Sequence, residues 1–207
     1  MPPVEAATAA PRDHPFIWVT WLASALAGPT CGWAPWFRTN HELQVTQPDD
    51  PDAPMWRQRH DLIVDQVDAD LLARGLTTER ELPLHVTFED GVSIYGKADL
   101  VATDVDARAI DIFEAKGGWA RPSDGLQLLI YMWLMEATVD DAADWDIRGW
   151  LVRQREQERF EDLPEGFDEA IEAGIAYLTA PVAPARVPGQ HCRFCSITTV
   201  DCPVRQD

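Results

Sequence analysis

The 207-residue chain has little positive charge, few cysteines and no apolar run long enough to cross a membrane. Lysine and arginine number 17 against 35 acidic residues, a formal charge of −18, and only Lys97 and Lys116 are lysines. This excess of acid argues against a protein that coats nucleic acid or membrane surfaces through general basic charge. It leaves room for an enzyme that contacts DNA through a local set of basic residues.

The longest apolar stretch, residues 16–28, is shorter than the roughly 20 residues that a membrane helix needs. It resembles the apolar core of a signal peptide, but Glu5 and Asp13 cancel the charge of Arg12 ahead of it. A signal peptide needs a positively charged start. We therefore expect a cytoplasmic protein with no membrane contact.

Three of the four cysteines lie within eleven residues, at Cys192, Cys195 and Cys202, and the fourth is Cys31. The Cys192-x₂-Cys195 spacing is typical of ligands to a metal or cluster. Two disulfides, buried thiols without a ligand, and a redox pair are the alternatives that spacing alone leaves open.

A hydrophobic share of 46% and a charged share of 25% are normal for one globular core that needs no disulfides. The residue pattern predicts helices, and strands with a turn at Asp90-Gly91 between the first two. The expected helices are 17–27, 55–73, 123–137 with Ser123 as N-cap, and 166–178; the expected strands are 81–88, 92–102, 109–114, 145–153 and 157–160. This order predicts an α/β fold with a central mixed β-sheet flanked by helices. We expect residues 1–14 to be a flexible tail, 47–54 an acidic loop, and 15–207 a single domain.

Chemistry-bearing residues occur at three places along the predicted sheet and the helix after it. Glu114 and Lys116 are two apart on a strand, so both side chains leave the same face. If Asp99 on the neighbouring strand points there, two carboxylates can hold Mg²⁺ or Mn²⁺ while the lysine orients a water molecule. Gln127 and Tyr131 are four apart on a helix, share a face and are candidates for the same site.

Each pair also has a simpler interpretation. Glu114 and Lys116 alone would be a surface ion pair of little value. However, Ile110, Ile112 and Phe113 are apolar, which indicates an interior strand, where an acid and a lysine need a functional reason. Gln127 and Tyr131 alone would be a polar seam on an apolar helix.

The order of these motifs resembles the PD-(D/E)XK nucleases, and more narrowly the RecB-like exonucleases with an iron–sulfur cluster, the branch that contains the CRISPR adaptation nuclease. That family has an early cysteine, a helical histidine, Gly-x-x-Asp, Glu-x-Lys, Gln-x₃-Tyr and three late cysteines. The resemblance covers residues 17–203. The chain departs from the pattern at Ala98, where the family has proline.

The resemblance implies roles for individual residues. The implied metal ligands, for Mg²⁺ or Mn²⁺, are His60, Asp99, Glu114 and the backbone carbonyl of Ala115; the implied catalytic group is Asp99, Glu114, Lys116, Gln127 and Tyr131. In this group Lys116 would position the attacking water. His41 and His85 compete with His60, which the position immediately before the hairpin favours.

The resemblance also implies that Cys31, Cys192, Cys195 and Cys202 bind a [4Fe–4S] cluster. Segments 28–40 and 189–204 would then join the two ends of the chain. Zinc remains the alternative, although Cys31 has no second cysteine beside it to form a paired knuckle.

The implied function is a Mg²⁺- or Mn²⁺-dependent DNA exonuclease, acting on single-stranded ends in DNA repair, recombination, phage replication or CRISPR adaptation, with the proteins of those pathways as partners. The alternative is a non-catalytic nucleic-acid-binding or adaptor module with a structural Fe–S or zinc site. Trp33, Trp36 and Trp119 are candidates for stacking on unpaired bases, with core packing as the simpler interpretation. Candidate phosphate contacts are Arg57, Arg59, Arg121, Arg153, Arg155 and Arg193.

Overall fold

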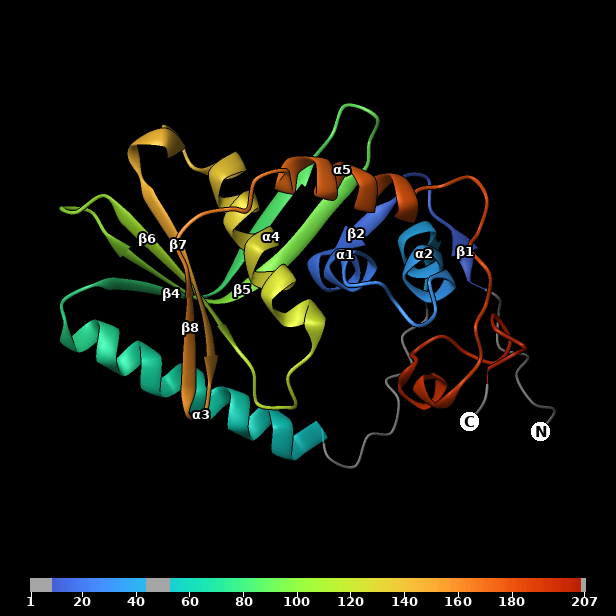
Figure 1. The fold of residues 1–207 in the computed structure, drawn as a ribbon, viewed down its shortest axis with the longest axis horizontal. Helices are drawn as coiled ribbons and strands as arrows, with labels where there is room; N and C mark the ends of the chain where they lie inside the picture. The colour runs from blue at the N-terminus through green and yellow to red at the C-terminus, as the bar shows by residue number, and fades with distance from the viewer. Residues whose placement is uncertain (1–8, 44–52, 206–207) are drawn as a thin grey trace.

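The computed structural model describes residues 9–43 and 53–205, which form eight β-strands, five α-helices and two 3₁₀ helices (Figure 1). The strands are β1 (Ala10–Pro11), β2 (Phe16–Trp18), β3 (His41–Glu42), β4 (Thr77–Thr87), β5 (Ser93–Asp104), β6 (Ala109–Ala115), β7 (Asp146–Arg153) and β8 (Glu156–Phe160). The helices are α1 (Val19–Leu26), α2 (Trp33–Asn40), α3 (Ala53–Ala73), α4 (Pro122–Thr138) and α5 (Phe167–Leu178), with 3₁₀ turns η1 (Ala142–Asp144) and η2 (Gln190–Phe194). None of the helices in these two ranges is both long and apolar enough to span a bilayer.

Six strands form one mixed sheet in the order β2-β5-β6-β7-β8, with β4 also paired to β5. β5 runs antiparallel to β4 and to β6, and β8 runs antiparallel to β7, whereas β2 is parallel to β5 and β7 is parallel to β6. β4 pairs with β5 from Ser93 to Thr103 along one edge. The other edge of β5 is shared: β2 pairs with residues 93–95 and β6 with residues 100–104. Residues 96–99 of β5 therefore lie between the segment that pairs with β2 and the segment that pairs with β6.

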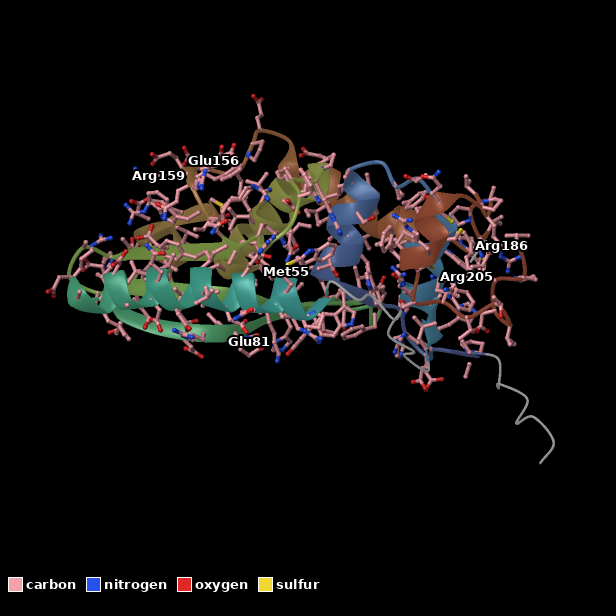
Figure 2. All side chains as sticks on the ribbon, turned by 90° about the horizontal axis from the view of Figure 1, so that it is seen from below. Met55, Glu81, Glu156, Arg159, Arg186 and Arg205 are labelled. Carbon is pink, nitrogen blue, oxygen red and sulfur yellow. The ribbon has the colours of Figure 1, made fainter. Side chains whose placement is uncertain are left out.

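Helices cover both faces of this sheet (Figure 1). The α4 face carries the main core, where buried residues of β5, β6 and β7 meet those of α1, α4 and α5, including Ile94, Ile112, Leu128 and Ile171. On the opposite face α3 buries a second cluster that contains Ile63, Val67, Leu100 and Phe113. In Figure 2, seen from below, α3 lies between the part of the molecule that carries Glu81 and the part that carries Glu156 and Arg159. Burial of apolar side chains on both sheet faces is the main stabilising contribution, at about 25 cal/mol per Å².

The cysteine-bearing segments lie together at one end of the molecule. A third apolar cluster contains Trp33 and Phe37 of α2 with Ile197 and Cys202 from the C-terminal segment. Figure 2 shows Arg186 and Arg205 in this region, at the end of the molecule beyond Met55. The two ends of the described chain are thus packed against each other.

The predicted α/β architecture with a mixed sheet is confirmed, and several boundaries differ. The expected helix from residue 17 begins at Val19, because residues 16–18 pair with β5 as strand β2. Ser123 was predicted as the N-cap of α4, but Arg121 holds that position and its backbone N–H donates to the Asp124 carboxylate at 3.0 Å.

Two expectations fall partly outside the described residues. Residues 1–8 of the expected flexible tail lie outside the described residues. Within the rest of that tail, Ala10 and Pro11 pair with Glu42 and His41 as a two-residue ladder. Residues 47–52 of the expected acidic loop also lie outside the described residues, and α3 begins directly after them at Ala53.

Candidate active site

Asp99 and Glu114 face each other across two neighbouring strands. Leu100 of β5 pairs with Phe113 of β6, so Asp99 and Glu114 are the next opposed positions in the same antiparallel register. The backbone N–H of Ala115 donates to Asp99 Oδ2 at 2.8 Å, which fixes the carboxylate against the end of β6. The two acids that were singled out by their motifs therefore meet at one place.

Asp99 lies at an irregularity in β5. It is the last residue of the segment 96–99, which separates the part of β5 that pairs with β2 from the part that pairs with β6. At this point the side chains of β5 that face the α4-side core change from even-numbered to odd-numbered residues. Ile94 and Ala98 contact the α4-side core, whereas beyond Asp99 it is Val101 that does so. Glu81 of the paired strand β4 has a positive φ of 51° near this point. A left-handed backbone at a glutamate is unusual and strained, and such irregularities concentrate at functional sites.

Lys116, Glu114 and Gln127 form a closed set of hydrogen bonds. Lys116 Nζ donates to Glu114 Oε1 at 2.7 Å and to Gln127 Oε1 at 2.8 Å. Gln127 Nε2 in turn donates to Glu114 Oε1 at 2.8 Å and lies 3.5 Å from the hydroxyl of Tyr131. α4 thus supplies a side chain that orients both partners at the end of β6. An ammonium has three N–H groups, and two of those of Lys116 are used here.

Glu114 is a buried acid with an unsatisfied oxygen. The residue is 2% exposed, and its Oε2 has no hydrogen-bond partner. Burial, and next the nearby charge of Asp99, raise the pKa of Glu114 to about 7. Burial also raises the pKa of Tyr131, so its hydroxyl stays protonated. A buried carboxylate beside the charge of a second carboxylate favours either a bound proton or a bound cation.

His60 reaches the same place from α3. Its Nε2 lies 3.0 Å from Asp99 Oδ2, and this hydrogen bond is the largest cause that raises the pKa of His60 to about 9. The competing histidines lie elsewhere: His41 stacks on Phe37, and His85 is exposed on β4. The predicted site side chains form two bonded sets, His60 with Asp99 and Glu114 with Lys116 and Gln127, and the backbone N–H of Ala115 binds Asp99 next to Glu114. Tyr131 lies at the edge of the second set, 3.5 Å from Gln127.

The order and geometry of these groups agree with a family comparison. The family model described as "PD-(D/E)XK nuclease superfamily" matches residues 36–203, most of the chain. The chain belongs to the PD-(D/E)XK nuclease superfamily. A solved structure described as "Crystal structure of SSO0001" has a TM-score of 0.54 at 16% sequence identity, with 95% of this chain and 90% of that chain covered. That similarity shows the fold alone. No curated protein matches the sequence significantly.

The donor set of this PD-(D/E)XK site fits a hard divalent cation. Carboxylate oxygens are the ligands that Mg²⁺ and Mn²⁺ prefer, and Glu114 Oε2 is a buried acceptor that lacks a donor. As the side chains are placed, residues 9–43 and 53–205 contain no group of three or more His, Cys, Asp or Glu side chains that could hold a metal ion. In this arrangement His60 bonds directly to Asp99, so the histidine and the acid hold each other.

The structure brings the four cysteines of this PD-(D/E)XK chain to one small cavity. Cys31, Cys192, Cys195 and Cys202 all line it, and none of the four is in a disulfide. The backbone N–H of Gly189 donates to Cys192 Sγ at 3.4 Å, and Arg38 Nη2 lies 3.6 Å from Cys195 Sγ. Cys202 is buried, which raises the pKa of its thiol. The predicted disulfide alternative is absent from the structure at these four positions.

Sequence reasoning missed Gly117 as a positioning residue. An added Cβ at Gly117 would lie 2.9 Å from the carbonyl oxygen of Trp56 and 3.1 Å from the backbone nitrogen of His60. Only glycine permits this approach, which brings the chain after Lys116 against the backbone of α3. Two consecutive glycines are also common in turns, so nothing in the Gly117-Gly118 sequence distinguishes a close approach from a turn.

The three candidate stacking tryptophans differ in exposure. Trp33 is 4% exposed and stacks on Phe37, while Trp36 donates from Nε1 to the carbonyl of Ala180 at 2.8 Å. These two have the core-packing role that was the simpler interpretation. Trp119 is 88% exposed beside the site.

Proposed function

We propose that this protein is a Mg²⁺- or Mn²⁺-dependent deoxyribonuclease that degrades single-stranded DNA from an end. The observation that carries the proposal is the convergence of Asp99, Glu114, Lys116 and Gln127 at the end of β6. Membership of a superfamily of nucleases supports the reaction class. The preference for single strands and ends follows the RecB-like resemblance.

Asp99, Glu114, the carbonyl of Ala115 and His60 are the proposed ligands. The bound ion supplies charge neutralisation at a phosphate oxygen and a lower pKa for bound water. Glu114 contributes the oxygen that has no other partner. For His60 to act as a ligand it must lose the proton that Asp99 favours, so we expect it to turn from Asp99 when the ion binds.

Lys116 is the proposed group that orients the attacking water. Two of its N–H groups are held by Glu114 and Gln127, which leaves the third for a water or a phosphate oxygen. Its ammonium also stabilises negative charge that develops on the phosphate during attack. Gln127 and Tyr131 position Lys116 and Glu114 rather than react.

The two lysines of the chain provide a matched test. Lys97 is exposed on β5 and pairs with Glu81, so Lys97→Ala removes the same charge without disturbing the hydrogen bonds of Lys116 to Glu114 and Gln127. We expect Lys116→Ala to slow Mn²⁺-dependent cleavage of end-labelled single-stranded DNA by at least about 100-fold, and Lys97→Ala to leave it within about twofold. Circular single-stranded DNA should resist the wild type, because it offers no end. Unchanged turnover in Lys116→Ala would remove the mechanism, and rapid cleavage of the circle would make the enzyme an endonuclease.

We also propose that the four cysteines hold a [4Fe–4S] cluster. Support comes from their shared cavity and from N–H donors aimed at two of the sulfurs, an arrangement typical of cluster thiolates. Arg38 and Arg186 supply positive charge beside the sulfurs. Anaerobically purified protein should be brown, with about four irons per chain that are lost in Cys31→Ser. A colourless protein with one zinc would assign a structural zinc site instead.

A further inference from the structure

A long groove leads to Lys116 on the α3 side of the molecule. It encloses about 1380 Å³ and runs between α3 and the β7–β8 hairpin. One wall consists of α3 residues from Met55 to Asp70, and the other of hairpin residues 152–157. Lys116, with Gly117, Gly118 and Trp119 after it, also lines the groove. The groove is therefore continuous with the site described above.

An exposed indole lies beside the reactive lysine. Trp119 is 88% exposed. Trp56, which lines the same groove from α3, is more shielded and is half-buried. A solvent-exposed tryptophan leaves a large apolar surface in water, which is unfavourable unless a partner covers it. The close approach of Gly117 to α3 places the backbone of this short segment, and Trp119 follows two residues further on.

Positive charge in the groove is available for phosphates. Arg59 and Arg155 line it, are exposed, and make no ion pair within the described part of the chain. Three acids also line the groove: Asp65 pairs with Arg80 at 2.6 Å, and Asp70 and Glu156 lie on α3 and on the β7–β8 hairpin. Four basic residues and three acids line the groove, whereas the whole chain has 17 basic and 35 acidic residues, so the charge of the groove is a local exception.

We propose that this groove binds the single-stranded DNA next to the scissile phosphate, and that Trp119 stacks on an unpaired base while Arg59 and Arg155 contact its phosphates. This inference deepens the nuclease proposal and rests on it for the identity of the strand. An aromatic face exposed to solvent requires an unstacked base, which a single strand offers and an intact duplex does not. Stacking tolerates any base, so the groove gives affinity and position without sequence preference.

Binding measured without catalysis tests the stacking role. Fluorescence anisotropy in EDTA would compare a labelled dT oligonucleotide with an abasic oligonucleotide of the same length. We expect Trp119→Ala to weaken dT binding by about 5- to 100-fold, and Trp119→Phe to weaken it less. The abasic strand should bind wild type and Trp119→Ala equally, since it has no base to stack. Equal dT affinity for wild type and Trp119→Ala, or an equal loss on the abasic strand, would overturn the proposal.

Salt dependence tests the arginine contacts. Arg59→Ala should lower the slope of log affinity against log salt by about 0.7, while Trp119→Ala leaves the slope unchanged. Arg74, exposed just beyond the other end of α3, provides the control, and Arg74→Ala should change neither affinity nor slope. An unchanged slope in Arg59→Ala would remove this residue from the strand path, and tighter binding of blunt duplex than of dT would reject the single-strand assignment.

These outcomes are separable from failure of the nuclease proposal. If neither the wild type nor any variant cleaves DNA with Mn²⁺, but Trp119→Ala still weakens dT binding in EDTA, the DNA-binding role of the groove is retained and the nuclease proposal is rejected. If wild type cleaves DNA but Trp119→Ala has an unchanged KM and unchanged dT affinity, the nuclease stands and the groove falls.

Discussion

The buried carboxyl of Glu114 makes the stability of the metal-free protein depend on pH. Its pKa rises from 4.5 to about 7 on folding, because burial and the charge of Asp99 disfavour the carboxylate. The folded protein therefore holds this proton to a higher pH than the unfolded chain does. The stability associated with it is present at low pH and is lost as pH rises toward 7.

At 1.36 kcal/mol per pKa unit, this group alone removes about 2 kcal/mol of stability between pH 5.5 and 8.5. His60 acts in the same direction and partly within this window, because its pKa is raised from 6.5 to about 9 and its contribution is lost as pH rises from the lower value through the higher one. It is present in both proteins compared below. Asp68, whose pKa is lowered, acts only in the acid range below this window.

Glu114→Gln keeps the Oε1 acceptor for Lys116 and Gln127 and removes the titration. Urea unfolding in EDTA, followed by fluorescence of the nine tryptophans, would measure the free energy of unfolding at pH 5.5 and 8.5. We expect the wild type to lose about 2 kcal/mol more than Glu114→Gln across this range. Mn²⁺ should restore the wild type at pH 8.5 and have no such effect on the variant, since a cation replaces the proton at the carboxylate.

Glu79→Gln, at an exposed position on β4, is the control and should match the wild type. Equal pH dependence in wild type and Glu114→Gln would refute the conclusion that Glu114 is buried as a protonated acid near neutral pH.

Three further changes test the surroundings of the site, each by urea unfolding. Gly117→Ala should destabilise the protein by about 1–3 kcal/mol, because its Cβ would meet the backbone of α3, whereas Gly118→Ala should be tolerated since nothing lies within 4 Å; equal effects would contradict the close approach. Asp124→Ala should lower the free energy of unfolding by about 3 kcal/mol, because this buried acid pairs with Arg153 at 2.6 Å and accepts the backbone N–H of Arg121. A loss below about 1 kcal/mol would show that water satisfies both partners. Leu128→Ala should cost about 2–5 kcal/mol, since this side chain is fully buried where α4 meets the sheet, and a smaller loss would indicate that the core closes around the space.

Local chemistry was sufficient to predict much of the site. The strand ending in Glu114 and Lys116 was expected to be interior because its other residues are apolar, and β6 is buried along its whole length. The placement of Gln127 and Tyr131 on one face of α4 follows from the helical repeat, since they are four residues apart. The meeting of Asp99 with Glu114 follows from the antiparallel pairing of β5 with β6, whereas the irregularity in β5 at Asp99 could not be predicted from the sequence.

Other features depend on contacts distant in sequence and have no local signal. Residues 16–18 continue an apolar run that favours a helix, yet they form a strand because β5 offers an unpaired edge to them. Gly117 approaches the backbone of α3 at residues about sixty positions earlier in the chain, and this contact has no signal in the residues around Gly117. The N-cap of α4 shifted from Ser123 because Pro122 suits the first helical turn and Asp124 satisfies the backbone N–H of Arg121.

The cavity lined by all four cysteines joins residue 31 to residues 192–202, across most of the chain. At a synthesis rate of about 5–20 residues per second, the later thiols emerge from the ribosome roughly 8–30 seconds after the first. During that interval Cys31 is present in the growing chain without the other three cysteines. The cavity can therefore be completed only after nearly the whole chain has been synthesised.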